Sequence, residues 1–212
     1  YGYILLGRYE DAHELLLAAR RQAETRGVAI LADYCDHHLA MALHGMGRLD
    51  EALARQRSAT RVFAERGVAR IEGHGRINVA QVLLELGRPE EALAEVDRVV
   101  ALAETSVPSL SAGALAVSAR CAAARGDVHD AVRHAERALA CGLEHGFDGL
   151  EMFVRLAHVE SLRLVGRETE SEQAAAEAEQ RLAAFSRHLT EPRSLLAFSA
   201  IAIHRRIREL AG

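Results

Sequence analysis

The chain has 212 residues, of which 50% are hydrophobic and 4% aromatic, and its formal net charge is -4. This composition is enough for a large core, and it lacks the basic excess that a free-standing nucleic-acid binder usually carries. No apolar run is long enough to span a membrane, and the three scattered cysteines form no CxxC pair. These features predict a cytosolic protein with reduced thiols and with no direct contact to nucleic acid or membrane.

A seven-residue motif occurs five times along the chain. In its clearest copies it reads apolar-Gly-Arg-x-acidic-acidic-Ala, and its glycines are Gly7, Gly47, Gly87, Gly126 and Gly166. The steps between these glycines are 40, 40, 39 and 40 residues. A period this regular is typical of a solenoid built from stacked supersecondary units.

Each residue type in the motif has a local physical role. The glycine can adopt the left-handed conformation that ends a helix, and the acidic residues suit the first turn of the next helix. The small residue that follows lets two antiparallel helices approach closely. It is Ala12, Ala52, Ala92 and Ala131 in four copies and Ser171 in the last. The motif is therefore interpreted as the elbow of a helical hairpin.

In chain order, the pattern predicts a short stump over 1–6 and a helix over 10–26. Hairpins follow at 28–46 with 49–66, 68–86 with 89–104, 108–125 with 128–145, and 147–165 with 168–185. A last helix is expected from 192 to 210. The predicted fold class is all-α, a right-handed α-solenoid of about five antiparallel hairpins plus a C-terminal helix. Residues 1–212 are expected to form one repeat domain.

Two places depart from the regular pattern. The fourth junction has Thr-Ser-Val-Pro-Ser at 105–109 instead of glycine, so an altered turn is expected, with Ser106 capping a helix that begins near Pro108. At the N-terminus, six residues before Gly7 are too few for a complete first helix. We therefore expect a piece of a longer protein, with apolar surface exposed at that end and a homodimer through this uncapped end as one consequence.

Three groups of residues suggest other chemistry. The run at 33–38 contains several possible metal ligands. Asp33 shares a helix face with His37, and Cys35 shares one with His38, but the two pairs point in different directions. A polar groove face is therefore the preferred interpretation. Gly73-His74-Gly75 lacks the strand–loop–helix context of a phosphate loop. No nucleophile–base motif is visible, so we expect a non-catalytic protein without a cofactor or metal. The elbow arginines at 8, 48, 88 and 167 are expected to form ion pairs with the next helix, or else to mark a docking edge.

The elbow pattern resembles that of the tetratricopeptide repeat family, most closely over residues 77–93. Two departures are clear. The period is 40 rather than roughly 34, and the bulky aromatic usual in the first helix is replaced by Asp36, Arg76, Leu115 and Arg155. Long repeats of this kind look like the superhelical regions of large bacterial transcription activators and signalling ATPases. The resemblance implies a regulatory scaffold that binds a protein or peptide segment, or alternatively a sensor that binds a small inducer inside the superhelix.

In that family the first helix of each hairpin lines the concave face, so aligning the elbows gives a candidate groove. Folding does not require polar side chains at these positions, so Asn78, Gln81 and Arg120 stand out. Amide side chains can bind a peptide backbone, and arginine can pair with anions. Solvated or merely packed side chains are the alternative. The full set of candidate groove residues is Tyr34, His38, Met41, His74, Asn78, Gln81, Arg120, Phe153 and Glu160.

Overall fold

The computed structural model describes residues 1–212 and contains twelve α-helices and no strand. The first six helices are α1 (Gly2–Leu5), α2 (Tyr9–Thr25), α3 (Ala29–Gly45), α4 (Leu49–Glu65), α5 (Ala69–Glu85) and α6 (Pro89–Thr105). The remaining six are α7 (Leu110–Arg125), α8 (Val128–His145), α9 (Glu151–Leu164), α10 (Glu168–Ser186), α11 (Pro192–Ala200) and α12 (Ala202–Ala211). The predicted all-α solenoid is confirmed.

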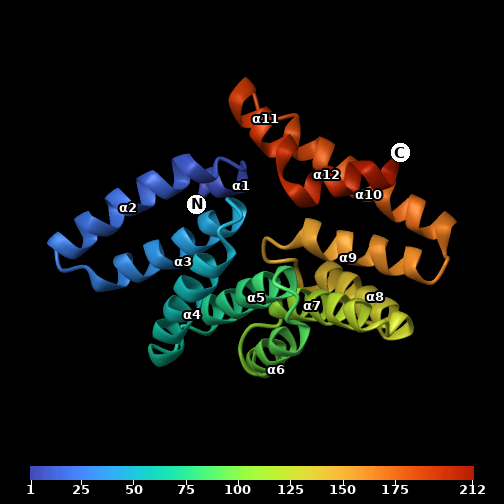
Figure 1. Cartoon of the computed structure of the whole chain (residues 1–212), viewed down its shortest axis with the longest axis horizontal. Coiled ribbons are helices and arrows are strands. Elements are labelled where there is room, and N and C mark those ends of the chain that lie inside the picture. Colours follow the sequence, from blue (N-terminus) through green and yellow to red (C-terminus); the bar gives the residue numbers. More distant parts are fainter.

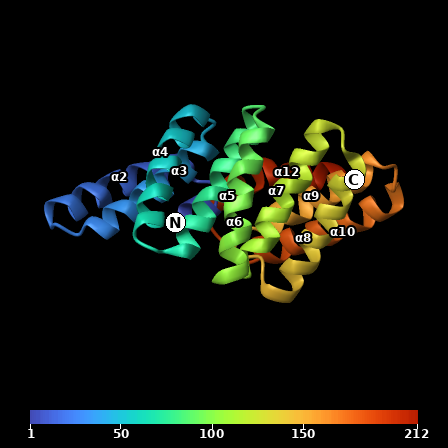
Figure 2. The same cartoon turned by 90° about the horizontal axis from the view of Figure 1, so that it is seen from below.

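The helices form two concentric layers (Figure 1). Helices α1, α3, α5, α7, α9 and α12 surround the centre, and α2, α4, α6, α8 and α10 lie outside them. Consecutive helices from α1 to α10 pack on one another, α12 packs on α10 and α11, and successive inner helices also contact one another. Seen from below, the hairpins stand side by side along the long axis (Figure 2).

The elbows have the predicted geometry. All five motif glycines have positive φ, between 71° and 82°, and each ends the inner helix that precedes it. The small residues at 12, 52, 92 and 131 are at most 2% exposed. In the fifth repeat the hydroxyl of Ser171 donates a hydrogen bond of 3.0 Å to the Val159 carbonyl, so the polar group is satisfied at an equally buried position.

The elbow arginines form the predicted ion pairs. Each is the residue before an outer helix and contacts the acidic residue three positions later: Arg8–Asp11, Arg48–Glu51, Arg88–Glu91 and Arg167–Glu170, at 2.5 to 2.7 Å. At three of these four elbows, one of the paired residues also contacts a residue from another repeat or from the C-terminal segment. Examples are Arg57 with Glu91 and Arg167 with Glu136.

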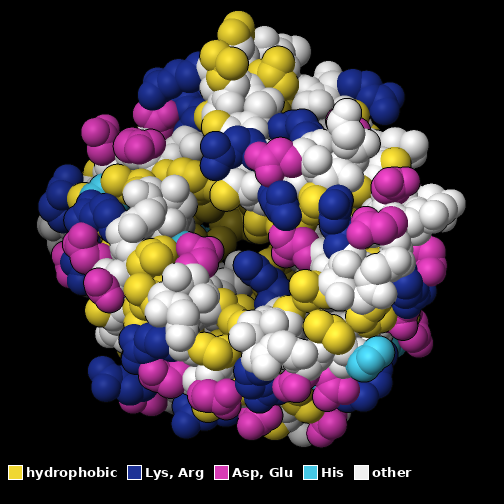
Figure 3. Space-filling model, turned by 45° about the vertical axis from the view of Figure 1, so that its right-hand side comes forward, with side chains coloured by type: hydrophobic (Ala, Val, Ile, Leu, Met, Phe, Trp, Pro, Cys, Tyr) yellow, Lys and Arg dark blue, Asp and Glu magenta, His cyan; other side chains and the backbone are white.

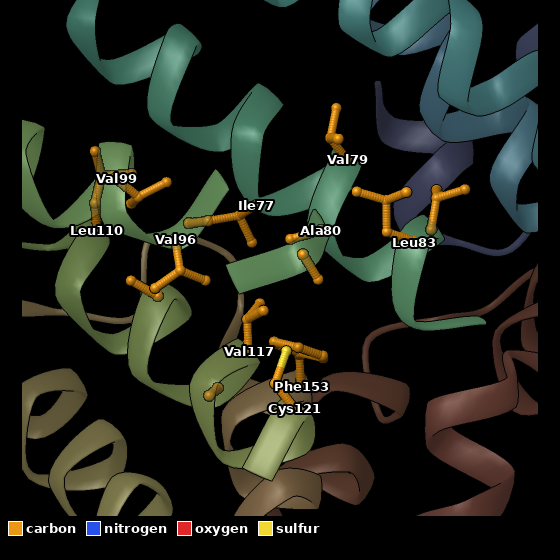
Figure 4. Packing of buried hydrophobic residues seen from close by; sticks show 14 of the residues in the cluster. Ile77, Val79, Ala80, Leu83, Val96, Val99, Leu110, Val117, Cys121 and Phe153 are labelled. Atoms are coloured by element: carbon orange, nitrogen blue, oxygen red, sulfur yellow. The ribbon is translucent and has the colours of Figure 1, made fainter. Parts of the chain in front are cut away.

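The core lies between the two layers and is deepest in the middle repeats. It contains α5 residues such as Ile77 and Leu83 together with Leu110, Val117 and Phe153 from the next two inner helices (Figure 4). Helix α7 is alanine-rich and almost entirely enclosed, with nine buried residues. This is the expected consequence of packing an inner helix against neighbours on both sides.

Three predicted helix limits were wrong. Helix α7 begins at Leu110 rather than at Pro108, and neither Ser106 nor Ser109 makes a side-chain cap hydrogen bond. Helix α9 begins at Glu151 rather than at 147, because the preceding residues form a loop. The final helix is divided at Ile201, whose extended ψ of 128° breaks the helix between α11 and α12.

The two ends of the chain meet. Arg8 donates to Glu191 (2.9 Å) and Arg193 to Asp11 (3.1 Å), and a side chain at Gly7 would collide with the Ala197 carbonyl. Part of the N-terminal end, expected to be uncapped, is thus covered by α11. The rest is exposed as predicted, with Leu15 at 55% and Leu31 at 48%. Whether copies associate through this surface stays a prediction.

We predict that Ala92→Leu lowers the free energy of unfolding by about 1–3 kcal/mol, because Ala92 is fully buried where α5 and α6 meet and a larger side chain overpacks that contact. Urea unfolding followed by circular dichroism measures the change. The matched control is Ala101→Leu on the exposed face of α6, which should leave stability within about 0.5 kcal/mol of the wild type. Equal stabilities for the two variants would contradict close packing at the elbow.

Candidate functional site: the concave face

The inner helices present a hollow toward the centre of the molecule. Figure 3 shows this hollow with hydrophobic side chains in its floor and charged side chains of both signs around it. The candidate groove residues lie on α3, α5, α7 and α9, and all but one are half-buried. The exception is Phe153, which is 3% exposed.

The prediction that Phe153 lines the groove was wrong, because its side chain is buried. Its ring belongs to the core between α5, α7 and α9, beside Val117 and Cys121 (Figure 4). Val117 and Ala157, which align with Asn78 when the elbow glycines are superposed, are buried in the same way. At these three positions, apolar side chains are packed into the core and are not available to a ligand.

Several other candidate residues already have partners in the chain. Tyr34 packs against the Phe63 ring with 5.0 Å between centroids, and His38 lies 5.0 Å from the Tyr1 ring. His74 contacts Asp148 (2.8 Å), and Glu160 pairs with Arg206 on α12 (3.3 Å). Met41 packs against the small cluster formed by Ile4, Ala12 and Ala42.

Asn78, Gln81 and Arg120 are different because their polar groups remain uncommitted. The two amides lie one turn apart on α5 and are half-buried. The side-chain hydrogen bonds of α5 involve its residues 70, 72, 74, 76 and 85, and neither amide makes one. Arg120 on the adjacent α7 has no ion pair, and its guanidinium lies 5.6 Å from the centre of the Phe153 ring. The other arginines of α5, α7 and α9, at 70, 76, 125, 155 and 163, each contact a carboxylate.

Three of the four positions where the family carries an aromatic form ion pairs instead, namely Asp36, Arg76 and Arg155. Arg76 is 13% exposed and contacts Glu72 (2.7 Å) and Glu95 (2.9 Å). At position 36 the charges are reversed: the inner helix supplies the carboxylate of Asp36, which accepts hydrogen bonds from Arg20 and Arg55. Sequence reasoning missed this linkage, although a signal existed: in both repeats opposite charges stand 19 residues apart, at 36 and 55 and at 76 and 95.

The possible metal ligands at 33–38 do not converge, because their side chains contact different partners. Asp33 pairs with Arg66 (2.6 Å), Asp36 with the two arginines above, and Cys35 is buried as a free thiol. The Nδ1 atom of His37 accepts a hydrogen bond of 2.9 Å from the Gln56 amide. The structure holds no group of three or more His, Cys, Asp and Glu side chains arranged for a metal ion.

The glycines at 73 and 75 serve packing rather than phosphate binding. Both lie inside α5, and a Cβ atom on Gly73 would collide with Leu110. On Gly75 it would collide with the Thr60 hydroxyl. Because there is no space for a side chain, the two glycines allow α5 to approach α4 and α7 closely.

A surface cavity of about 270 Å³ lies away from the candidate groove, among α8, α9 and α10. Its lining includes Arg155, His158 and Glu177. A volume at the lower limit of drug-sized pockets and a rim of charged side chains do not match the apolar enclosure of a typical small-molecule site. None of the helices is both long and apolar enough to cross a lipid bilayer.

The chain matches no sequence family and no curated protein in sequence. Solved structures do match its fold. The structure of a Rap protein complexed with Competence and Sporulation Factor aligns with a TM-score of 0.65 and 15% identity, over 98% of this chain and 60% of that one. A putative kinesin light chain of Podosopora anserina with nearly identical TPR-like repeats aligns at 0.50 and 18% identity, over 82% of this chain and 95% of that one. A variant of that kinesin light chain with one substitution aligns at 0.52 and 18% identity, over 86% and 98%.

The fold is therefore that of the tetratricopeptide-type α-solenoids, as the elbow pattern predicted. More particularly, it is a long-repeat solenoid, since its elbows recur every 39 or 40 residues. The chain spans about 60% of the length of the Rap structure. At identities of 15% to 18%, the comparison establishes the fold alone.

The buried histidines of α3 make stability depend on pH. Burial lowers the pKa of His38 from 6.5 to about 4 and that of His37 to about 3. Between pH 6.5 and 4 the unfolded chain therefore binds protons that the native chain does not. The contribution of the two neutral histidines to the free energy of unfolding is fully present above pH 6.5. It is lost as the pH falls through this window, because both folded-state pKa values are depressed.

We predict that His38→Leu flattens this dependence, removing about 2–3 kcal/mol of the stability lost between pH 6.5 and 4. Urea unfolding at a series of pH values measures it. The control is His129→Leu, at an exposed position of α8, which should retain the wild-type slope. A wild-type slope in His38→Leu would show that His38 is accessible to protons in the native state.

Proposed function

We propose that this chain is a non-catalytic scaffold that binds an extended peptide or a flexible protein segment on its concave face. The observation that carries the proposal is the uncommitted set of Asn78, Gln81 and Arg120 on adjacent inner helices. Amide side chains can pair with the backbone of an extended segment, and an unpaired guanidinium attracts its anionic groups. We infer that the binding surface is centred on these three residues.

The surroundings of Arg120 support this assignment. A half-buried guanidinium has lost part of its hydration, so an anion from a ligand gives it back an interaction that water no longer supplies in full. Glu85, an acidic group that interacts with it electrostatically, is itself hydrogen-bonded to His44 at 2.9 Å. Arg120 is therefore held against the Phe153 ring with its charge available.

The biological setting is a further part of the proposal. The long-repeat elbow pattern and the similarity to a Rap protein crystallised with Competence and Sporulation Factor support a regulatory repeat domain of a bacterial signalling or transcription regulator. We place it in the cytoplasm, as one domain of a larger protein. A sensor that binds a small inducer inside the superhelix is the second candidate.

The proposal predicts that single truncations in the groove weaken binding of a peptide selected from a random library displayed against the full chain. Asn78→Ala and Arg120→Ala should each raise the dissociation constant about tenfold, which corresponds to about 1.4 kcal/mol. Fluorescence anisotropy with the labelled peptide measures it. Arg98→Ala is the matched control, because Arg98 is an exposed arginine on the outer helix α6.

Two results would count against the groove. Both groove variants could stay folded and bind at wild-type strength, in which case the elbow edge that contains Arg48 and Arg88 becomes the better surface. Alternatively, the library could yield no binder while small metabolites raise the melting temperature. Loss of that effect in Arg120→Ala would then support a sensor whose inducer binds inside the superhelix.

A further inference from the structure

The loop before α9 carries a feature that the groove does not explain. Asp148 is the only residue other than glycine with a positive φ in the chain, at 48°, and it stands between Gly146 and Gly149, which also have positive φ. For an aspartate this left-handed conformation costs free energy, so something must hold it there. The loop lies near the centre of the molecule, where α9 begins (Figure 1).

Three donors from other elements hold the Asp148 carboxylate. Oδ2 accepts hydrogen bonds from His74 Nε2 (2.8 Å) and from the Ser109 hydroxyl (3.3 Å), and Oδ1 accepts from the Arg70 guanidinium. The donors belong to α5 and to the start of α7, so they converge from two inner helices on one carboxylate. The Asp148 side chain is only 7% exposed, whereas that of Arg70 is 62% exposed.

This convergence is a complete receptor for a carboxylate. One guanidinium, one imidazole and one hydroxyl contact the two oxygens, and hydrogen bonds to an ionised carboxylate are stronger than those between neutral groups. Burial raises the pKa of Asp148, but His74 and Arg70 outweigh it, so the group stays ionised with a pKa below its usual range. The exposed Arg70 side chain lies at the rim of this site, next to solvent.

The backbone around Asp148 differs from the backbone at the same place in the two earlier repeats. In the two earlier repeats the residue two positions after the glycine already begins the inner helix, at Ala29 and Ala69. The equivalent residue here is Asp148, yet α9 begins three residues later and has 14 residues where α3 and α5 have 17. Residues 148–150 therefore form a loop at the place where α3 and α5 have their first turn.

We propose that Arg70, His74 and Ser109 form a binding site for a carboxylate of the groove ligand, and that Asp148 occupies this site in the free protein as a displaceable latch. When an acidic residue of the ligand takes the site, residues 148–150 wind into the first turn of α9. The inference rests on the proposed function and extends it, since His74 lies one turn before Asn78 on α5. The ligand class it specifies is a peptide segment with an acidic side chain or terminal carboxylate near the residues bound by Asn78 and Gln81.

The test uses a small probe that needs no groove, N-acetyl-aspartate amide, titrated into the full isotope-labelled chain and followed by NMR on the His74 and Arg70 side chains. Asp148→Ala removes the internal carboxylate and disfavours the left-handed conformation. The variant should bind the probe at least tenfold more tightly than the wild type does, and the Cα shifts of 148–150 should move toward helical values. N-acetyl-asparagine amide, the neutral control, should not bind.

A second substitution shows whether the site is the one assigned. Adding His74→Ala to Asp148→Ala should abolish binding of the probe. If Asp148→Ala does not fold, Asp148→Asn keeps the shape without the charge and should show the same order of affinities. Equal affinity in wild type and variant, or equal binding of the neutral probe, would overturn the latch. Peptide binding that still depends on Asn78 would then leave the groove proposal standing.

Discussion

Each hairpin depends on the small side chain that follows its elbow glycine, because a larger one would hold the two helices apart. With Ala52 and Ala92 buried at this contact, the inner and outer helices meet closely, and the same small rotation is repeated from hairpin to hairpin. The repetition brings the inner helices around a common centre and carries α11 back to the first elbow, where Arg8 reaches Glu191. The concave face exists because the elbows are so similar.

Most of the architecture could be predicted from the sequence because it is encoded locally and repeatedly. Gly47 and Gly87 require a left-handed turn, and the arginine after each of them pairs with a carboxylate only three residues away. Such signals need no knowledge of the rest of the chain. The break at Ile201 has no comparable signal, since neither glycine nor proline marks it.

The candidate site was predicted less well because it depends on contacts between distant residues. Alignment placed Phe153 on the groove face, but the alanine-rich α7 leaves room for its ring to enter the core. Asp148 reaches His74 across 74 residues, and no local pattern indicates that pairing. What alignment could identify was a set of polar residues that folding does not require, and Asn78, Gln81 and Arg120 are the members whose groups stay uncommitted.

The central claim is that a ligand binds to the inner layer of helices, and photo-crosslinking tests it most directly. A library-selected peptide with benzoylphenylalanine at successive positions would be irradiated with the full chain, and the linked residues identified by mass spectrometry. The account predicts crosslinks on α5 and α7, close to Asn78 and Arg120, from at least the central peptide positions. Crosslinks confined to the outer helices, or to the elbow edge around Arg48 and Arg88, would contradict it.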